Sequence, residues 1–261
     1  LSGAVYQGIF RNPLVSPDVL GVSSGAGFGA VLGILLWGTG TGTSVIAFVC
    51  GMASVGLVYY FSRSRGSVSM MSLVLSGIII SSIFSALISL VKYSADPYDK
   101  LPAITYWLMG SFAKADFDKI QIIGLPMIAA GALLIAIRWR INILSLGEEE
   151  ARSLGVNPAR IRNIAIVAAT ILTALSVTAC GIVGWVGLVI PHMCRRMVGV
   201  DHARLLPAAC FMGAIFLALV DICARSLLAA ELPIGILTAL LGAPFFAFLL
   251  KRTREKQGDW S

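Results

Sequence analysis

Long runs without a charged residue constrain this chain more than any other feature. A helix needs about 20 apolar residues to cross the roughly 30 Å hydrocarbon core of a bilayer. Uncharged runs near this length cover residues 19–37, 43–61, 66–91, 120–137, 163–194, 205–220 and 232–250. Because 57% of the residues are hydrophobic and 13% are charged, most of the surface is expected to face lipid. We therefore expect an all-α, polytopic membrane helix bundle.

The chain opens inside another apolar run, residues 1–10, without a basic leader or an initiator Met. Ten helical residues reach about 15 Å, which is half of the bilayer core. We expect this run to be the end of a spanning helix, and residues 1–261 to be a single transmembrane domain that is N-terminally incomplete.

The run 163–194 has no charge for 32 residues, which is long for one helix and short for two. Lys and Arg accumulate in cytoplasmic loops. If the run is a hairpin that turns near 180–184, 15 of the 20 basic residues share one side. The other side keeps Lys92, Lys100, Lys114, Lys119 and Arg225. A single helix would remove this bias, so we expect a hairpin, eight complete spans plus the partial one, and a cytoplasmic C-terminus.

The net charge of +7 does not indicate nucleic acid as a partner. The basic residues lie in short flanks between apolar runs, where membrane topology explains them. The five cysteines fall in or beside apolar segments without CxxC spacing. We expect them to be buried small hydrophobic residues and not a disulfide framework.

No catalytic group or metal site is expected from the residue pattern. The two histidines, His192 and His202, are too few for a dedicated metal site. Asp221 stands four residues before Arg225, a spacing that favours an ion pair on one helix face. The chain contains no GxxxxGK[ST] phosphate loop and is not expected to hydrolyse ATP by that route.

Glycines recur at short regular intervals in two spans. They are Gly25, Gly29 and Gly33, and then Gly181, Gly184 and Gly187. Such spacing places a smooth stripe on one helix face and permits close helix contact in lipid. The contact is expected either within one bundle or at a seam between two subunits.

A polar insert, residues 144–162, interrupts the apolar runs. Three glutamates from Glu148 to Glu150 suit the start of a helix, because they complement its dipole. Leu146, Ala151 and Leu154 would form a small apolar face. A transporter without an ionisable residue in mid-span lacks the usual means of ion coupling, so we interpret the insert as a handle for a separate ATPase.

Two alternatives remain open. In a gradient-driven secondary transporter the insert would be an ordinary loop, and in a metal-ion ABC permease more His or carboxylate side chains would line the pathway. On the opposite side, residues 92–119 contain balanced charges, with Pro97, Pro102 and Trp107. We expect an external loop there, with a short interfacial helix near 103–112 that suits a docking face.

Several ordered motifs carry a resemblance to a known family. They are N-P-L-V-S-P-D-V-L-G-V-S-S-G-A at 12–26, Y-W-L-M-G-S-F at 106–112, G-I-V-G-W-V-G-L-V-I-P-H-M-C-R at 181–195, D-H-A-R-L-L-P at 201–207, E-L-P-I-G at 231–235 and G-A-P-F at 242–245. In these motifs, and over essentially its whole length, the chain resembles the FecCD-type permeases of type II ABC importers, which take up iron-siderophores, haem or cobalamin.

The resemblance implies a ten-helix subunit in the plasma (inner) membrane of a prokaryote. It implies a homodimer or pseudo-dimer with the pathway at the interface, a separate ABC ATPase that uses ATP and Mg, and a substrate-binding protein outside. The permease itself would bind no cofactor. Which of the three substrates is carried stays open.

The resemblance also assigns roles to residues. Residues 144–156 would be the cytoplasmic coupling helices, and Arg225 would dock the binding protein. The coupling residues would be Leu146, Gly147, Glu148, Glu150, Ala151, Arg152, Leu154 and Gly155. The cytoplasmic gate would comprise Ser67, Val68, Ser69, Met70 and Met71.

Overall fold

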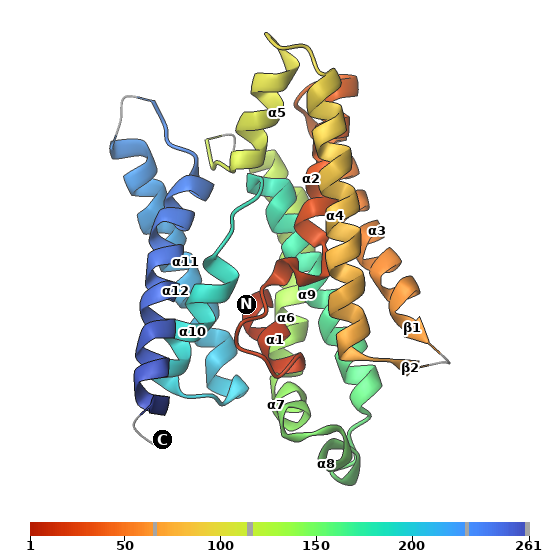
Figure 1. Cartoon of the computed structure of the whole chain (residues 1–261), viewed down its shortest axis with the longest axis vertical. Coiled ribbons are helices and arrows are strands. Elements are labelled where there is room, and N and C mark those ends of the chain that lie inside the picture. Colours follow the sequence, from red (N-terminus) through yellow and green to blue (C-terminus); the bar gives the residue numbers. More distant parts are fainter. Residues whose placement is uncertain (65–66, 114–116, 228–229, 259–261) are drawn as a thin grey trace.

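The computed structural model describes residues 1–64, 67–113, 117–227 and 230–258, and these ranges form a bundle of helices (Figure 1). In chain order the elements are α1 (Ser2–Ile9), the 3-10 helix η1 (Pro17–Leu20), α2 (Val22–Trp37), α3 (Thr41–Ser62), β1 (Arg63–Ser64), β2 (Ser67–Val68), α4 (Met70–Ser94), α5 (Lys100–Met109), α6 (Phe117–Ala136), α7 (Arg138–Leu146), α8 (Glu148–Ser153), α9 (Pro158–Cys180), α10 (Val186–Val198), α11 (His202–Ser226) and α12 (Ile234–Gly258). The two short strands pair antiparallel. The predicted helix bundle is confirmed.

The number of spans differs from the sequence prediction. Among the described residues, α3, α4, α9 and α11 are long and apolar enough to cross a membrane, and α6 with α7, bent by 50°, forms a possible fifth. α2 and the apolar part of α12 are shorter. α10 has 13 residues, or ~20 Å of helix against a core of about 30 Å. The count of eight complete spans is not confirmed, because uncharged runs include irregular segments as well as helix.

The uncharged run 163–194 forms two helices, as its charge pattern predicts. α9 ends at Cys180 and α10 begins at Val186. In the break between them, Gly181 has a φ of 75°, a conformation that glycine adopts without steric cost. A Cβ on Gly181 would also overlap the carbonyl oxygen of Trp107. The end of α5 therefore packs directly on the α9–α10 break.

α1 lies in the middle of the bundle (Figure 1). All its residues from Gly3 to Ile9 are buried, and it contacts α7, α9, α10 and α11. The hydroxyls of Tyr6 and Thr170 form a buried hydrogen bond of 2.8 Å. The largest hydrophobic cluster gathers around this helix, so α1 is the central element of the core.

The glycine stripe of α2 packs inside the bundle. Cβ atoms on Gly25, Gly29 and Gly33 would all lie against α3, at backbone or Cβ atoms. The reading of contact within one bundle is therefore confirmed for this stripe. The second glycine series is different, because Gly181 and Gly184 lie in the α9–α10 break and not on a helix. That part of the prediction is wrong, since glycine spacing alone does not distinguish a helix face from a turn.

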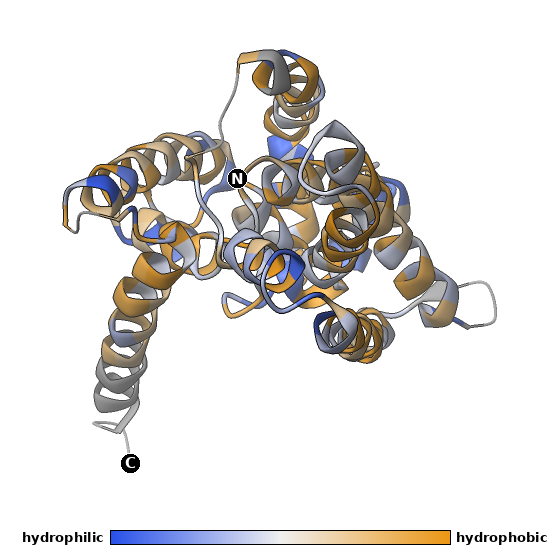
Figure 2. Ribbon diagram, turned by 90° about the horizontal axis from the view of Figure 1, so that it is seen from above, coloured by the Kyte–Doolittle hydropathy of each residue, from blue (hydrophilic) through white to orange (hydrophobic). Residues whose placement is uncertain are grey.

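α5 and α8 lie at opposite ends of the long axis of the molecule (Figure 1). Between these ends, large apolar side chains face outward on α3, α4, α6, α11 and α12. Figure 2 shows hydrophobic residues around the sides of the bundle. Lipid contact favours such a belt, because hydrocarbon solvates apolar side chains and leaves backbone polar groups to be satisfied inside helices.

Candidate functional site

The predicted coupling segment, residues 144–156, folds as the end of α7, a single glycine and α8. Gly147 has φ 152° and ψ 162°, and a Cβ there would overlap the carboxylate of Glu150. α8 begins at Glu148 with three glutamates in its first turn, where the helix dipole favours negative charge. The sequence thus predicted the start of this helix correctly, and the structure shows why its first neighbour is glycine.

The segment presents two leucines to its surroundings. The side chains of Leu146 and Leu154 are 63% and 59% exposed, whereas Ala151 is fully buried. Ala151 therefore does not belong to the exposed apolar face that the sequence predicts. It turns inward because α8 packs against α7 and α9. Glu150, Arg152 and Gly155 are exposed, so the outer face combines two leucines with charges of both signs.

The Glu148 carboxylate links α8 to α9, because it accepts hydrogen bonds from one guanidinium group on each helix. Its Oε1 accepts from Nη2 of Arg162 on α9, and its Oε2 accepts from Nη2 of Arg152 at 3.1 Å. The hydrogen bond from Arg162 holds the pKa of the Glu148 carboxyl below its usual range, partial burial opposes this shift, and the positive charges of both arginines add to it. Glu148 is therefore a carboxylate at neutral pH.

A cavity of about 310 Å³ adjoins this ion pair. Its lining comes from the end of α1, the first residue of α4, α7, α8 and α9. The lining residues are Ile9, Phe10, Arg11, Met70, Leu144, Glu148 and Arg162. The cavity thus brings the predicted coupling segment next to Met70 of the predicted gate.

A second polar contact fastens α7 to the bundle. Oδ1 of Asn142 accepts from the backbone N–H of His202 at 3.3 Å and lies 3.2 Å from its Nδ1. His202 is buried at the first residue of α11, and a Cβ on Gly8 of α1 would overlap its ring. The contacts that Asn142 makes with His202 and Arg162 makes with Glu148 were not predicted from the sequence. The signal available there was a polar or charged side chain beside an uncharged run.

The predicted gate lies at the start of α4. Ser67 and Val68 form β2, opposite β1, and the turn residues 65–66 lie outside the described ranges. Ser69 caps α4, because its Oγ accepts from the backbone N–H of Ser72 at 3.1 Å. Met70 lines the cavity described above, and Met71 is 70% exposed. A gating role for these residues stays a prediction.

α4 exposes one continuous face along its length. This face carries large apolar residues toward its start and toward its end, namely Met71, Leu75, Ile78, Ile79, Ile83, Leu90 and Tyr93. In its second half it includes the exposed hydroxyls of Ser82, Ser85 and Ser89. Ser82 and Ser89 donate to the carbonyls four residues earlier, at 2.9 and 3.0 Å, so these hydroxyls are satisfied even in an apolar environment.

At the α5 end, Arg225 forms the predicted ion pair. Its Nε donates to Oδ2 of Asp221 at 3.0 Å, and the Arg225 side chain is 50% exposed. The neighbouring Glu231 accepts from Ser111 Oγ at 3.4 Å, which joins the α11–α12 connection to the end of α5. Arg225 is therefore held in position on an open surface, and its docking role stays a prediction.

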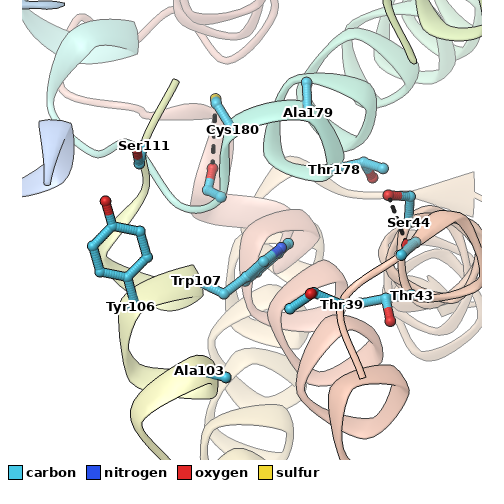
Figure 3. A pocket seen from close by; sticks show the side chains of 12 residues that line it. Thr39, Thr43, Ser44, Ala103, Tyr106, Trp107, Ser111, Thr178, Ala179 and Cys180 are labelled. Atoms are coloured by element: carbon cyan, nitrogen blue, oxygen red, sulfur yellow. Dashed lines mark hydrogen bonds between the residues drawn. The ribbon is translucent and has the colours of Figure 1, made fainter. Parts of the chain in front are cut away.

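A small pocket of about 70 Å³ lies beside α5 at the same end (Figure 3). Tyr106 and Trp107 of α5 line it together with hydroxyl residues from the α2–α3 connection, the first turn of α3 and the end of α9. Those hydroxyl residues are Thr39, Thr43, Ser44 and Thr178. The predicted helix near 103–112 is present as α5, Lys100–Met109. Just after α5, the backbone N–H of Ser111 donates to the backbone carbonyl oxygen of Cys180 at 2.8 Å, which joins the end of α5 to the end of α9.

An apolar helix bundle with an exposed polar segment at one end is the architecture of a polytopic membrane protein. The model of the FecCD transport family matches residues 1–252. The chain therefore belongs to the FecCD transport family, as its motifs indicate.

Curated relatives agree with this membership but differ in their substrates. The molybdate import system permease protein MolB of Haemophilus influenzae is 46% identical, over 98% of this chain and 76% of the relative. The cobalamin import system permease protein BtuC of Halobacterium salinarum is 39% identical, over 98% and 68%. The hemin transport system permease protein HmuU of Yersinia pestis is 35% identical, over 98% and 78%.

Solved structures show the same fold. A metal-chelate type ABC transporter in an inward-facing conformation matches with a TM-score of 0.92 and 45% identity, over 96% of this chain and 80% of that chain. PsaBC from Streptococcus pneumoniae matches with a TM-score of 0.62 and 18% identity, over 95% and 84%. The second likeness concerns the fold alone.

Proposed function

We propose that this chain is the permease subunit of an ATP-driven importer in the plasma (inner) membrane of a prokaryote. The exposed α7–Gly147–α8 segment carries the proposal, because its two leucines and mixed charges offer an ATPase subunit a compact docking surface. In this arrangement the α8 end and the C-terminus face the cytoplasm. ATP and Mg are used by the separate ATPase chain, and a substrate-binding protein docks at the α5 end.

A second permease copy completes the pathway in this proposal. The apolar residues at the start of the α4 face would pack against the partner copy, and Ser82, Ser85 and Ser89 would face the substrate. Such a pathway needs no charged site in mid-membrane, because selectivity resides in the binding protein. The proposal therefore accounts for the apolar and hydroxyl residues of α4 without an ion-coupling residue.

For the substrate we propose an iron chelate (siderophore), haem or cobalamin, supported by the relatives that import cobalamin and hemin. Molybdate is a second candidate, favoured by the 46% identity to a molybdate permease. Uptake of labelled haem, cobalamin, iron-siderophore and molybdate into vesicles that contain the complex and its binding protein separates them. The true substrate is taken up and is not displaced by the other three.

The proposed function predicts ATP-driven uptake by a complex of several chains. We expect an ATPase with a Walker A sequence to co-purify from detergent. Vesicles that contain the complex should accumulate substrate only with ATP on the α8 side and binding protein on the α5 side. Uptake driven by a proton gradient without ATP would instead support the secondary transporter, and failure to recover any ATPase would contradict the importer.

Arg225→Glu is expected to slow association of the binding protein with the permease. A half-exposed charge at an interface rim mainly affects the association rate and its salt dependence. We expect the affinity to fall roughly fivefold, measured by surface binding at two salt concentrations. Arg225→Lys, which keeps the charge, is the control. Equal association rates for the Glu and Lys variants would remove Arg225 from the docking surface.

A further inference from the structure

The ion pair between Glu148 and Arg162 differs from the other ion pairs in the described ranges. The pairs Lys100–Asp99, Arg152–Glu148 and Arg225–Asp221 join residues no more than four positions apart. Glu148 and Arg162 lie on different helices, α8 and α9. This pair therefore connects the proposed coupling segment to a membrane-spanning helix by side chains.

The two partners are buried unequally. The Arg162 side chain is 10% exposed and the Glu148 side chain is 41% exposed. Nε of Arg162 is buried and has no hydrogen-bond partner in the structure, so Glu148 supplies the negative charge that compensates a largely buried guanidinium. Removal of one partner from such a pair is strongly unfavourable, because the other charge is left buried alone. α8 is consequently held to the start of α9 in this conformation.

The ion pair and the start of α4 border the same cavity of about 310 Å³. Met70 and Phe10 line it together with Glu148 and Arg162. Empty space of this size gives no attractive contact across it. The side-chain link from α8 therefore leads to α9, and the cavity leaves space between this link and Met70 at the start of α4.

We propose that the Glu148–Arg162 pair is the mechanical link through which a displacement of α8 reaches the spanning helices, with Arg162 as a positioning residue. This inference rests on the proposed function, since it assumes that an ATPase displaces α8. α9 packs against α1, α2, α3 and α6. A displacement of α8 would thus reach the core of the bundle through α9, and the cavity beside the pair provides room for that motion.

The test measures ATP hydrolysis and substrate uptake in parallel in vesicles that contain the assembled permease and ATPase. Arg162→Glu and Glu148→Arg each place like charges together. We expect both to keep ATP hydrolysis within about twofold while uptake per ATP falls at least tenfold, a loss of about 1.4 kcal/mol of coupling. The double variant, with the charges exchanged, should recover most of the coupling.

Arg204→Glu is the control, because it reverses an exposed arginine in the first turn of α11, outside the coupling segment and the ion pair. It should leave uptake per ATP nearly unchanged. Glu148→Gln keeps an isosteric acceptor without the charge, and it serves if the reversed variants fail to assemble with the ATPase. It should lower uptake per ATP without lowering hydrolysis.

The inference is overturned if the single variants, or Glu148→Gln, transport as many substrate molecules per ATP as the parent. It is also overturned if the exchanged double variant is no better coupled than either single variant. These outcomes differ from failure of the proposed function, in which the parent complex itself shows no ATP-dependent uptake.

Discussion

Gly147→Pro is expected to abolish most ATP-driven uptake while the complex continues to hydrolyse ATP. Proline fixes φ near −65°, whereas Gly147 has a φ of 152°. The chain would have to leave α7 in another direction, and α8 would no longer pack against the start of α9. An incompatible proline costs roughly 3 kcal/mol or more, so we expect uptake to fall by about tenfold at least.

The measurement is uptake per ATP hydrolysed in vesicles. Glu150→Arg should act in the same direction more weakly, because the Glu150 carboxylate lies against Gly147 and favours the start of α8. Gly42→Pro is the control, because Gly42 lies in the first turn of α3, where helices tolerate proline. Unchanged uptake per ATP in both Gly147→Pro and Glu150→Arg would contradict the coupling assignment.

Gly77→Ala is expected to destabilise the folded bundle, although alanine is the better helix former. A Cβ on Gly77 of α4 would overlap the carbonyl oxygen of Val19 and lie 3.3 Å from Cα of Leu20. Both are backbone atoms, so no side-chain rotation relieves the contact. Leu20 is fully buried, and the next residue, Gly21, is held by a hydrogen bond from Ser54 Oγ of 2.8 Å. α4 must therefore move away from η1.

Overpacking of this kind costs about 1–3 kcal/mol. The loss of stability should appear as a lower midpoint of thermal unfolding in detergent. Unfolding is monitored as the fraction of protein that remains monodisperse. Gly56→Ala in α3 is the matched control, because its added Cβ meets nothing within 4 Å. There the gain in helix propensity, up to about 1 kcal/mol, should leave the midpoint equal or higher. Equal midpoints for the two variants would show that α4 and η1 are not in close contact.

The hairpin of α9 and α10 illustrates what can be predicted from sequence. Counting basic residues on each side selected two helices over one for residues 163–194, and the structure has its break at 181–185. This prediction succeeded because Lys and Arg accumulate in cytoplasmic loops, so their positions along the chain limit how often the chain can cross the membrane between them. The start of α8 at Glu148 followed for a similar local reason.

Other features could not be predicted in this way. Ala151 belongs to the same apolar pattern as Leu146 and Leu154, but it is buried while they are exposed. The one-dimensional pattern does not say on which side of α8 the bundle lies. Likewise Arg162 is visible as a charge beside an uncharged run, but its partner Glu148 is set by the turn at Gly147 and by the packing of α8 on α9.

The sequence by itself determined the helical class, the approximate runs and the break between α9 and α10. These follow from the transfer free energies of side chains and from the need of backbone groups for hydrogen bonds inside lipid, which are local properties. Only the tertiary structure decided that α1 is central, that the α2 glycines face α3, and that Glu148 holds Arg162 beside a cavity. These depend on which surfaces of distant segments meet, and helix packing in lipid is decided by shape and polar partners that no single segment contains.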